Sequence, residues 1–340
     1  MKPAEPTDVR LNEPLLPTGR GELSGRTLRA LRSRPGPESA LPVDAAVHEA
    51  DAYGEDLHLA LYLCYELHYC GFQGVDPAWE WQPALLGLRA DLERRFLDAL
   101  RRDTEDRPHS ADEAFDEILV EPVNGTGLTH YLRDEGELWQ LREYAAQRSL
   151  YHLKEADPHL WVVPRLRGRA KAGMVAVEFD EYGGGRADRM HSRLFADLMT
   201  DLGLDTTYGR YVDAATAETL ASVNLMSMFG LHRALRGALV GHFAAVEVTS
   251  SPASRRLAQA MRRTGAGDTA VHFYAEHVEA DAVHEQVVRR EVVGGLLEDE
   301  PWLEPDVAFG VAATELLDTL VGERTLAAWR DGRTSLRTPL

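Results

Sequence analysis

Cysteine is scarce in this 340-residue chain, which contains only Cys64 and Cys70. Two cysteines cannot build the disulfide framework of a small secreted domain, and their spacing matches no zinc-binding pair. Long apolar runs are also missing, since no stretch approaches the about 18 uninterrupted apolar residues that a membrane-spanning helix needs. Residues 1–42 lack the apolar core of a secretory leader. We therefore expect a cytoplasmic protein without a membrane partner.

Positive charge is in short supply as well. The chain has 37 Lys and Arg residues against 55 Asp and Glu residues, which gives a formal net charge of −18. Such a surface repels phosphate backbones, so nucleic acid is not an expected partner. Hydrophobic residues make up 44% of the chain, which is enough for a packed core and excludes global disorder.

Strand signals are rare, because alternation of apolar and polar residues with hairpin turns is scarce throughout. The chain therefore predicts an all-α fold of helices packed around a shared interior. Residues 1–43 contain seven prolines and are expected to form a mobile tail with a short helix near Gly25–Arg34. The polar stretch from Asp103 to Gly127 is the best candidate for an internal boundary.

That boundary divides the chain into an accessory helical region at 44–127 and a main domain at 128–337. Helices are expected at Ala45–Tyr69 and Leu85–Arg102 in the accessory region. The helical segments expected in the main domain are 128–157, 166–182, 187–203, 214–246, 251–264, 268–296 and 305–331.

One helical stripe could carry chemistry. His277, Asp281 and His284 are spaced i, i+4 and i+7, so on a helix they point within about 60° of one another. Imidazole and carboxylate together form a ligand set that suits iron, manganese or zinc. A solvated helix could carry the same residues by chance.

Other helices must supply facing ligands, and Glu155, Glu181, His191 and Glu247 are the candidates. Metal sites in helical bundles use Glu and His residues that project inward from several helices. Glu155 and Glu247 also read as solvated residues near a helix end, and Glu181 could be solvated, with Glu178 competing for its role. The glycines at 183–185 either let the chain unwind and bring Glu181 to His191, or only end a helix.

Roughly residues 140–337 resemble the haem-oxygenase-like diiron oxidases and oxygenases, in the branch called iron-containing redox enzymes. The segments that carry the resemblance are 151–164, 168–204, 208–251 and 273–286, followed by Trp329 and Ser335–Leu336–Arg337. The family pattern is a Glu, a second Glu about 26 positions on, a His ten later, a further Glu and a His-x3-Asp-x2-His helix. The residues at these positions are Glu155, Glu181, His191, Glu247, His277, Asp281 and His284.

The resemblance implies a seven-helix haem-oxygenase-like bundle with an N-terminal helical extension, two Fe(II) ions and O2 as co-substrate, without haem or flavin. Because the ligand pattern is closest to the N-oxygenase domain of N-nitrosourea biosynthesis, it favours N-oxygenation of a small amine- or carboxylate-bearing metabolite. Oxidative C–C cleavage or desaturation of an amino or fatty acid is the alternative outcome. A non-catalytic helical binding protein is the alternative of another class. The resemblance leaves three questions open: whether the metal is iron or manganese, whether an external electron donor takes part, and whether the chain forms a homodimer.

Residues around the expected site allow several interpretations. Tyr182, Tyr274 or Glu276 could hold the metal-binding imidazoles. The apolar run with Met226 and Met228 predicts core packing or the wall of a substrate cavity. The residues that could bind a substrate carboxylate or form surface salt bridges are Arg210, Arg233 and Arg236.

Glu66 and His68 do not form a second metal site in this interpretation. Two residues apart on a helix, their side chains point about 160° from each other and would not chelate one ion together.

Overall fold

The computed structural model describes residues 13–36, 41, 44–119 and 125–340, and for residues 44, 45, 279, 281 and 282 only the course of the backbone. Every regular element within these residues is helical, which confirms the all-α prediction. In the described part of the chain no helix is long and apolar enough to cross a membrane. The α-helices are α1 Glu22–Leu31, α2 Asp44–Glu49, α3 Glu55–Glu66, α4 Pro83–Asp103, α5 Ala111–Leu119, α6 Leu128–Asp134, α7 Leu138–His152, α8 Asp157–Leu160, α9 Gly168–Glu181, α10 His191–Asp201, α11 Ala217–Leu231, α12 Arg236–Thr264, α13 Asp268–Val287, α14 Gly294–Asp299 and α15 Glu304–Arg330.

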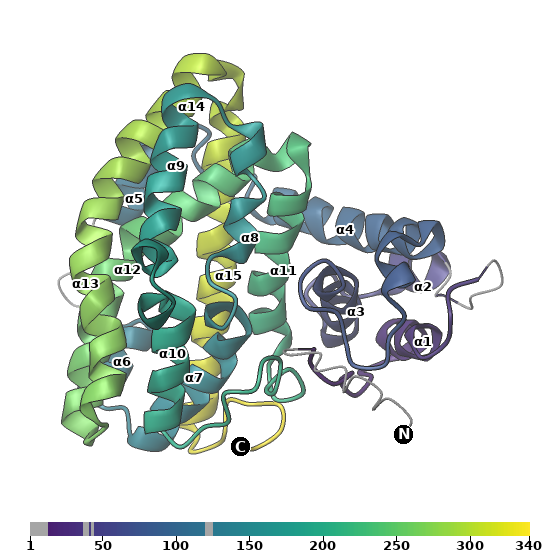
Figure 1. The fold of residues 1–340 in the computed structure, drawn as a ribbon, viewed down its shortest axis with the longest axis horizontal. Coiled ribbons are helices and arrows are strands. Elements are labelled where there is room, and N and C mark those ends of the chain that lie inside the picture. The colour runs from purple at the N-terminus through teal and green to yellow at the C-terminus, as the bar shows by residue number, and fades with distance from the viewer. Residues whose placement is uncertain (1–12, 37–40, 42–43, 120–124) are drawn as a thin grey trace, which may run out of the picture.

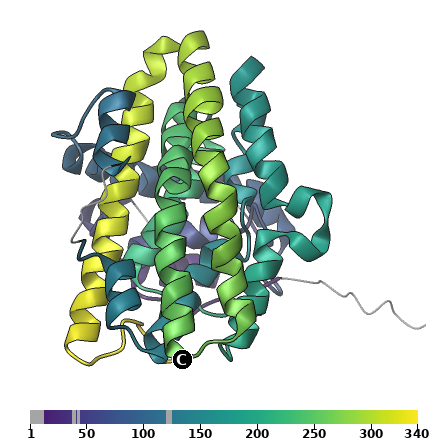
Figure 2. The same ribbon diagram turned by 90° about the vertical axis from the view of Figure 1, so that its left-hand side faces the viewer.

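The long helix α12 lies between α13 and α15, and its contacts with these two form the centre of the bundle (Figure 2). Two glycines set the separation of α12 from α15. A Cβ atom at Gly241 would overlap the backbone carbonyl oxygen of Val307, and one at Gly310 would overlap that of Ala238. The two backbones therefore approach closely enough that no side chain fits between them at these points.

Helices α1 to α4 form a layer on one side of the bundle, next to α11 (Figure 1). Helix α3 connects the two parts, because it packs against α1 and α4 in the layer and against α11 in the bundle. Its Leu57, Leu59, Leu61 and Leu63 are all buried although they do not share one face. A helix that is apolar all round must be covered on all sides, which explains its central place.

Residues 13–36 contain one helix, α1, which overlaps the short helix expected near Gly25–Arg34, while residues 1–12 of the expected tail lie outside the described part. Helix α1 packs against α3 and buries Leu23, Leu28 and Leu31. The backbone N–H groups of Leu23 and Ser24 each donate a 2.8 Å hydrogen bond to the carboxylate of Asp56. An acidic side chain from another helix thus caps α1 and fixes it to the layer.

The helix expected over Ala45–Tyr69 is instead two helices, α2 and α3. They are separated by a turn in which Asp51 Oδ1 accepts a 3.0 Å hydrogen bond from the backbone N–H of Tyr53. Aspartate competes for backbone donors in this way, which favours a turn over a continuous helix.

The segments expected at 214–246 and 251–264 also have different ends. The chain leaves the helical conformation at His232, which separates α11 from α12, and α12 then continues without a break through Pro252. Proline removes one backbone donor, but packing on α13 and α15 maintains the helix, and the Ser251 hydroxyl donates to the Val278 carbonyl of α13 at 3.3 Å. The expected boundary near 127 stays a prediction, because residues 120–124 lie outside the described part.

Candidate metal centre

Six of the seven predicted ligands meet in the interior of the bundle. Glu155 follows the end of α7, Glu181 ends α9 and His191 begins α10. Each of the six residues is at most 6% exposed. The other three of the six come from helix interiors: Glu247 lies on α12, and His277 and His284 lie on α13. The side chain of the seventh predicted ligand, Asp281, lies outside the described residues.

The six side chains form two groups that share one carboxylate. In the first group one potential ligand atom from each of Glu155, Glu181, His191 and His277 lies within 4.8 Å of the others. In the second group the same holds for Glu181, Glu247 and His284. Glu181 belongs to both groups, so its two oxygens can serve two neighbouring positions.

Direct contacts between imidazoles and carboxylates hold these groups together. His191 Nδ1 lies 2.6 Å from Glu181 Oε2. His284 Nδ1 lies 3.1 Å from Glu247 Oε2 and 3.7 Å from Glu181 Oε1, while its Nε2 lies 3.3 Å from Asp180 Oδ2. The Nδ1 atom of His284 thus faces the second group, and Asp180 orients the ring from the other side.

A backbone carbonyl orients His277. Its Nδ1–H donates a 2.8 Å hydrogen bond to the carbonyl oxygen of Phe273, one turn earlier on α13. That bond fixes the tautomer in which Nε2 carries the lone pair. The rings of His277 and His191 lie 4.3 Å apart between centroids, so both imidazoles border the first group.

The glycine segment brings Glu181 to His191, as one of the two sequence interpretations held. All three glycines have a positive φ, of 67°, 62° and 78°. A Cβ atom at Gly183 would lie 2.6 Å from the backbone carbon of Arg189 and 2.7 Å from Met190 N. Only glycine fits this return of the chain, which closes the ten-residue separation that a continuous helix would keep.

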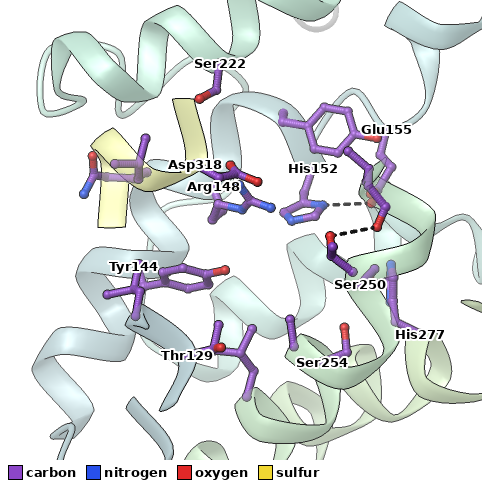
Figure 3. Close-up of a pocket in the computed structure, with 18 of the residues that line it drawn as sticks. Thr129, Tyr144, Arg148, His152, Glu155, Ser222, Ser250, Ser254, His277 and Asp318 are labelled. Atoms are coloured by element: carbon purple, nitrogen blue, oxygen red, sulfur yellow. Dashed lines mark hydrogen bonds and ion pairs between the residues drawn. The ribbon is translucent and has the colours of Figure 1, made fainter. Parts of the chain in front are cut away.

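His152 also contacts the cluster, although the family pattern contains only Glu155 of this pair. It is 9% exposed, and its Nδ1 lies 3.0 Å from Glu155 Oε2, which fixes the orientation of that carboxylate (Figure 3). The i, i+3 spacing of the two residues was the available signal. Of the three proposed partners of the imidazoles, Tyr182 instead donates to Asp157 at 2.6 Å, Glu276 is exposed, and Tyr274 lines a cavity.

Glu178 lies one turn before Glu181 and belongs to neither group. It is 2% exposed, and neither of its oxygens has a hydrogen-bond donor among the described residues. Burial, reinforced by the nearby Glu181 and Glu247 carboxylates, raises its pKa well above the usual range of a glutamate. The interior around these carboxylates therefore disfavours further negative charge.

Glu66 and His68 contact different partners. Glu66 faces the ammonium of Lys154, whereas His68 Nδ1 lies 3.2 Å from Glu80 Oε1.

A cavity of about 300 Å³ opens beside the first group (Figure 3). Met226 lines this cavity, whereas Met228 is buried in the core. The apolar run that contains them therefore supplies both a cavity wall and core packing, each through a different residue. None of the three predicted arginines lines the cavity: Arg210 pairs with Asp205, Arg236 pairs with Glu300, and Arg233 is exposed. Sequence reasoning missed Arg148, the arginine of α7 that does line it.

Comparison with known proteins agrees with this geometry. The sequence model of the family described as iron-containing redox enzyme matches residues 142–319, which include all seven predicted ligands. A nitrosourea synthase from Streptomyces achromogenes subsp. streptozoticus is 25% identical over 189 residues, which cover 54% of this chain and 40% of that protein. The chain thus matches less than half the length of this relative.

Proposed function

The chain belongs to the family of iron-containing redox enzymes, and from this premise we propose that its buried cluster holds two ferrous ions that use O2 to oxidise a small amine- or carboxylate-bearing metabolite. N-oxygenation is the proposed reaction. It is favoured by the name of the matched relative, since a nitrosourea contains an oxidised nitrogen.

The sharing of Glu181 between two ligand groups is the observation that carries this proposal. Three buried carboxylates, from Glu155, Glu181 and Glu247, converge on a small volume. Carboxylates this close repel one another, and burial adds to the cost of their charge. Two divalent cations would neutralise them, and a mixed set of imidazole and carboxylate donors suits ferrous iron.

The groups suggest which residues would hold each ion. Glu155, His191 and His277 would bind the first, and Glu247 and His284 the second. Glu181 would bridge the two. The family pattern adds Asp281 to this set.

Ferrous iron, when bound, supplies the electrons that reduce O2. The protein contributes orientation and a shaped space. His152 holds Glu155, and the Phe273 carbonyl holds His277 with Nε2 toward the cluster. The apolar side chains of Val223 and Met226 form part of the cavity wall beside the centre, which limits water there.

Iron uptake tests the binding part of the proposal. Glu181→Gln and His284→Ala should each bind less ferrous iron than the parent protein after anaerobic loading and gel filtration, measured by elemental analysis. His272→Ala is the matched control, because His272 lies on the same helix but is exposed. Unchanged iron content in both cluster variants would contradict the assignment.

Reaction with O2 tests the catalytic part. Stopped-flow mixing of the ferrous protein with O2 should give a transient visible absorbance that the cluster variants lack. Product mass from candidate amines then separates the outcomes: a gain of oxygen supports N-oxygenation, whereas a loss of carbon or of two hydrogens supports cleavage or desaturation. A protein that binds iron without any O2-dependent change would support the non-catalytic alternative.

A further inference from the structure

The cavity beside the metal centre has a second end that is lined by polar side chains. Glu155 and His277 lie at one end of the cavity, and Arg148, Tyr144 and Asp318 lie at the other (Figure 3). Arg148 and Tyr144 come from α7, and Asp318 comes from α15. A molecule in the cavity would therefore contact the proposed metal ligands and this polar end together.

Arg148 is the residue at this end whose surroundings call for a ligand. The structure shows no ion pair within 4.0 Å and no hydrogen bond for its guanidinium among the described residues, and its Nε is buried without an acceptor. The charged residue beside it at this end is Asp318, which interacts with the guanidinium without forming an ion pair within 4.0 Å. A buried guanidinium prefers a planar anion that accepts two hydrogen bonds, such as a carboxylate.

Two tyrosines add donors to the same end. The Arg148 guanidinium carbon lies 5.9 Å from the centroid of the Tyr144 ring, one turn earlier on α7. Tyr274, which is 3% exposed, also lines the cavity, and its hydroxyl has no hydrogen-bond partner among the described residues. A guanidinium and two phenolic hydroxyls together can donate several hydrogen bonds to one oxygen group, and these bonds are stronger when that group is an anion.

We propose that the Arg148 end of the cavity binds the carboxylate of the substrate, and that the substrate is a small amino carboxylate whose nitrogen then lies at the metal centre. This inference rests on the proposed function and specifies its substrate class. A cavity of about 300 Å³ is at the small end of the range for ligand sites, which fits a metabolite of amino-acid size. Tyr144 and Tyr274 would orient the carboxylate, and Asp318 would hold the guanidinium.

The test compares matched ligands with and without the carboxylate. A panel of free amino acids, 5-aminopentanoate among them, is measured against the corresponding primary amides and against pentylamine. Binding to the full-length protein is measured by calorimetry, without metal and after anaerobic loading with ferrous iron. At least one carboxylate should bind about tenfold more tightly than its amide, in line with the loss of a charge-assisted hydrogen-bond pair.

Variants assign that preference to Arg148. Arg148→Met should lose the preference for the carboxylate, whereas Arg142→Met, the same change on the same helix but outside the cavity, should keep it. Arg148→Lys serves as the second variant if Arg148→Met proves unstable. It keeps the charge but loses the two-pronged hydrogen bonding of a guanidinium, so its preference for the carboxylate should be intermediate. Iron content should be the same in all of these variants.

Two results would overturn the proposal: amides that bind as tightly as carboxylates across the panel, or an Arg148→Met variant that retains the preference. Carboxylate binding that depends on Arg148 in a protein without iron uptake would refute the proposed function alone. Iron uptake and O2 reactivity without such binding would refute only the substrate class.

Discussion

Removing the ammonium of Lys154 is expected to destabilise the protein far more than removing an exposed charge. Lys154 precedes Glu155 in the chain and is 4% exposed, and its Nζ lies 3.1 Å from Oε2 of Glu66, which is fully buried on α3. The Tyr208 hydroxyl donates to the same oxygen at 2.9 Å. The ammonium also lies 4.1 Å from the centroid of the Tyr69 ring. This buried pair connects the N-terminal layer to the segment that carries Glu155.

The magnitude follows from the burial of both charges. Loss of one partner of a buried ion pair leaves the other uncompensated and typically costs about 3–5 kcal/mol. Lys154→Met and Glu66→Gln should therefore each lower the free energy of unfolding by about that amount. The double variant leaves no unpaired charge, so it should be destabilised by less than the sum of the two single changes.

Urea denaturation of the iron-free protein measures these values, with an unchanged m-value as the check that the same transition is compared. Arg94→Met is the control, because Arg94 pairs with Asp91 at 2.8 Å on the surface of α4 and should cost at most about 1 kcal/mol. If the two single changes simply add in the double variant, Lys154 and Glu66 are not energetically coupled and the reasoning is refuted.

Three further outcomes are expected. Gly241→Ala and Gly310→Ala should each lower the free energy of unfolding by several kcal/mol, since the new methyl group would overlap the Val307 or Ala238 carbonyl; an unchanged urea midpoint would contradict the close approach. Burial raises the pKa of Glu315 from 4.5 to about 7, so stability present below pH 4.5 is lost as the pH rises through 7. Glu315→Gln should remove up to about 3 kcal/mol of that loss, measured by urea denaturation at pH 4.5 and 8. Ferrous iron at 100 times its dissociation constant should add about 2.7 kcal/mol, and an equal Tm with and without iron would contradict binding to the folded state.

The part of the site on α13 could be predicted from spacing alone. His277 and His284 are seven residues apart, so helical geometry places them on one face, and both are buried in the cluster. Their division between two ligand groups could not be predicted in this way, because it depends on where α9 and α12 place Glu181 and Glu247. Position along one helix does not encode the arrangement of its neighbours.

Other features depend on tertiary packing in the same way. Arg148 lies on a helix whose buried side also includes Glu143, Gln147 and His152, so no apolar stripe separates the inner face of α7 from its outer face. The proline-rich composition before residue 43 suggested a tail, but Asp56 on α3 supplies the cap that holds α1. Helix α12 continues through Pro252 because its neighbours compensate for the missing donor.

The proposed metal ligands lie at two kinds of backbone position, helix interiors and helix ends, which differ in how many hydrogen bonds fix the backbone. Glu247, His277 and His284 come from the interiors of α12 and α13, where hydrogen bonds on both sides fix the backbone. Glu155, Glu181 and His191 come from helix ends, where fewer such bonds constrain the chain. The shared carboxylate, Glu181, is followed directly by the turn that contains Gly183–Gly185. A bridging ligand must adjust as the charge of the metals changes. In the proposed centre Glu181 would have that freedom at a helix end next to this turn, while α12 and α13 would keep Glu247, His277 and His284 in place.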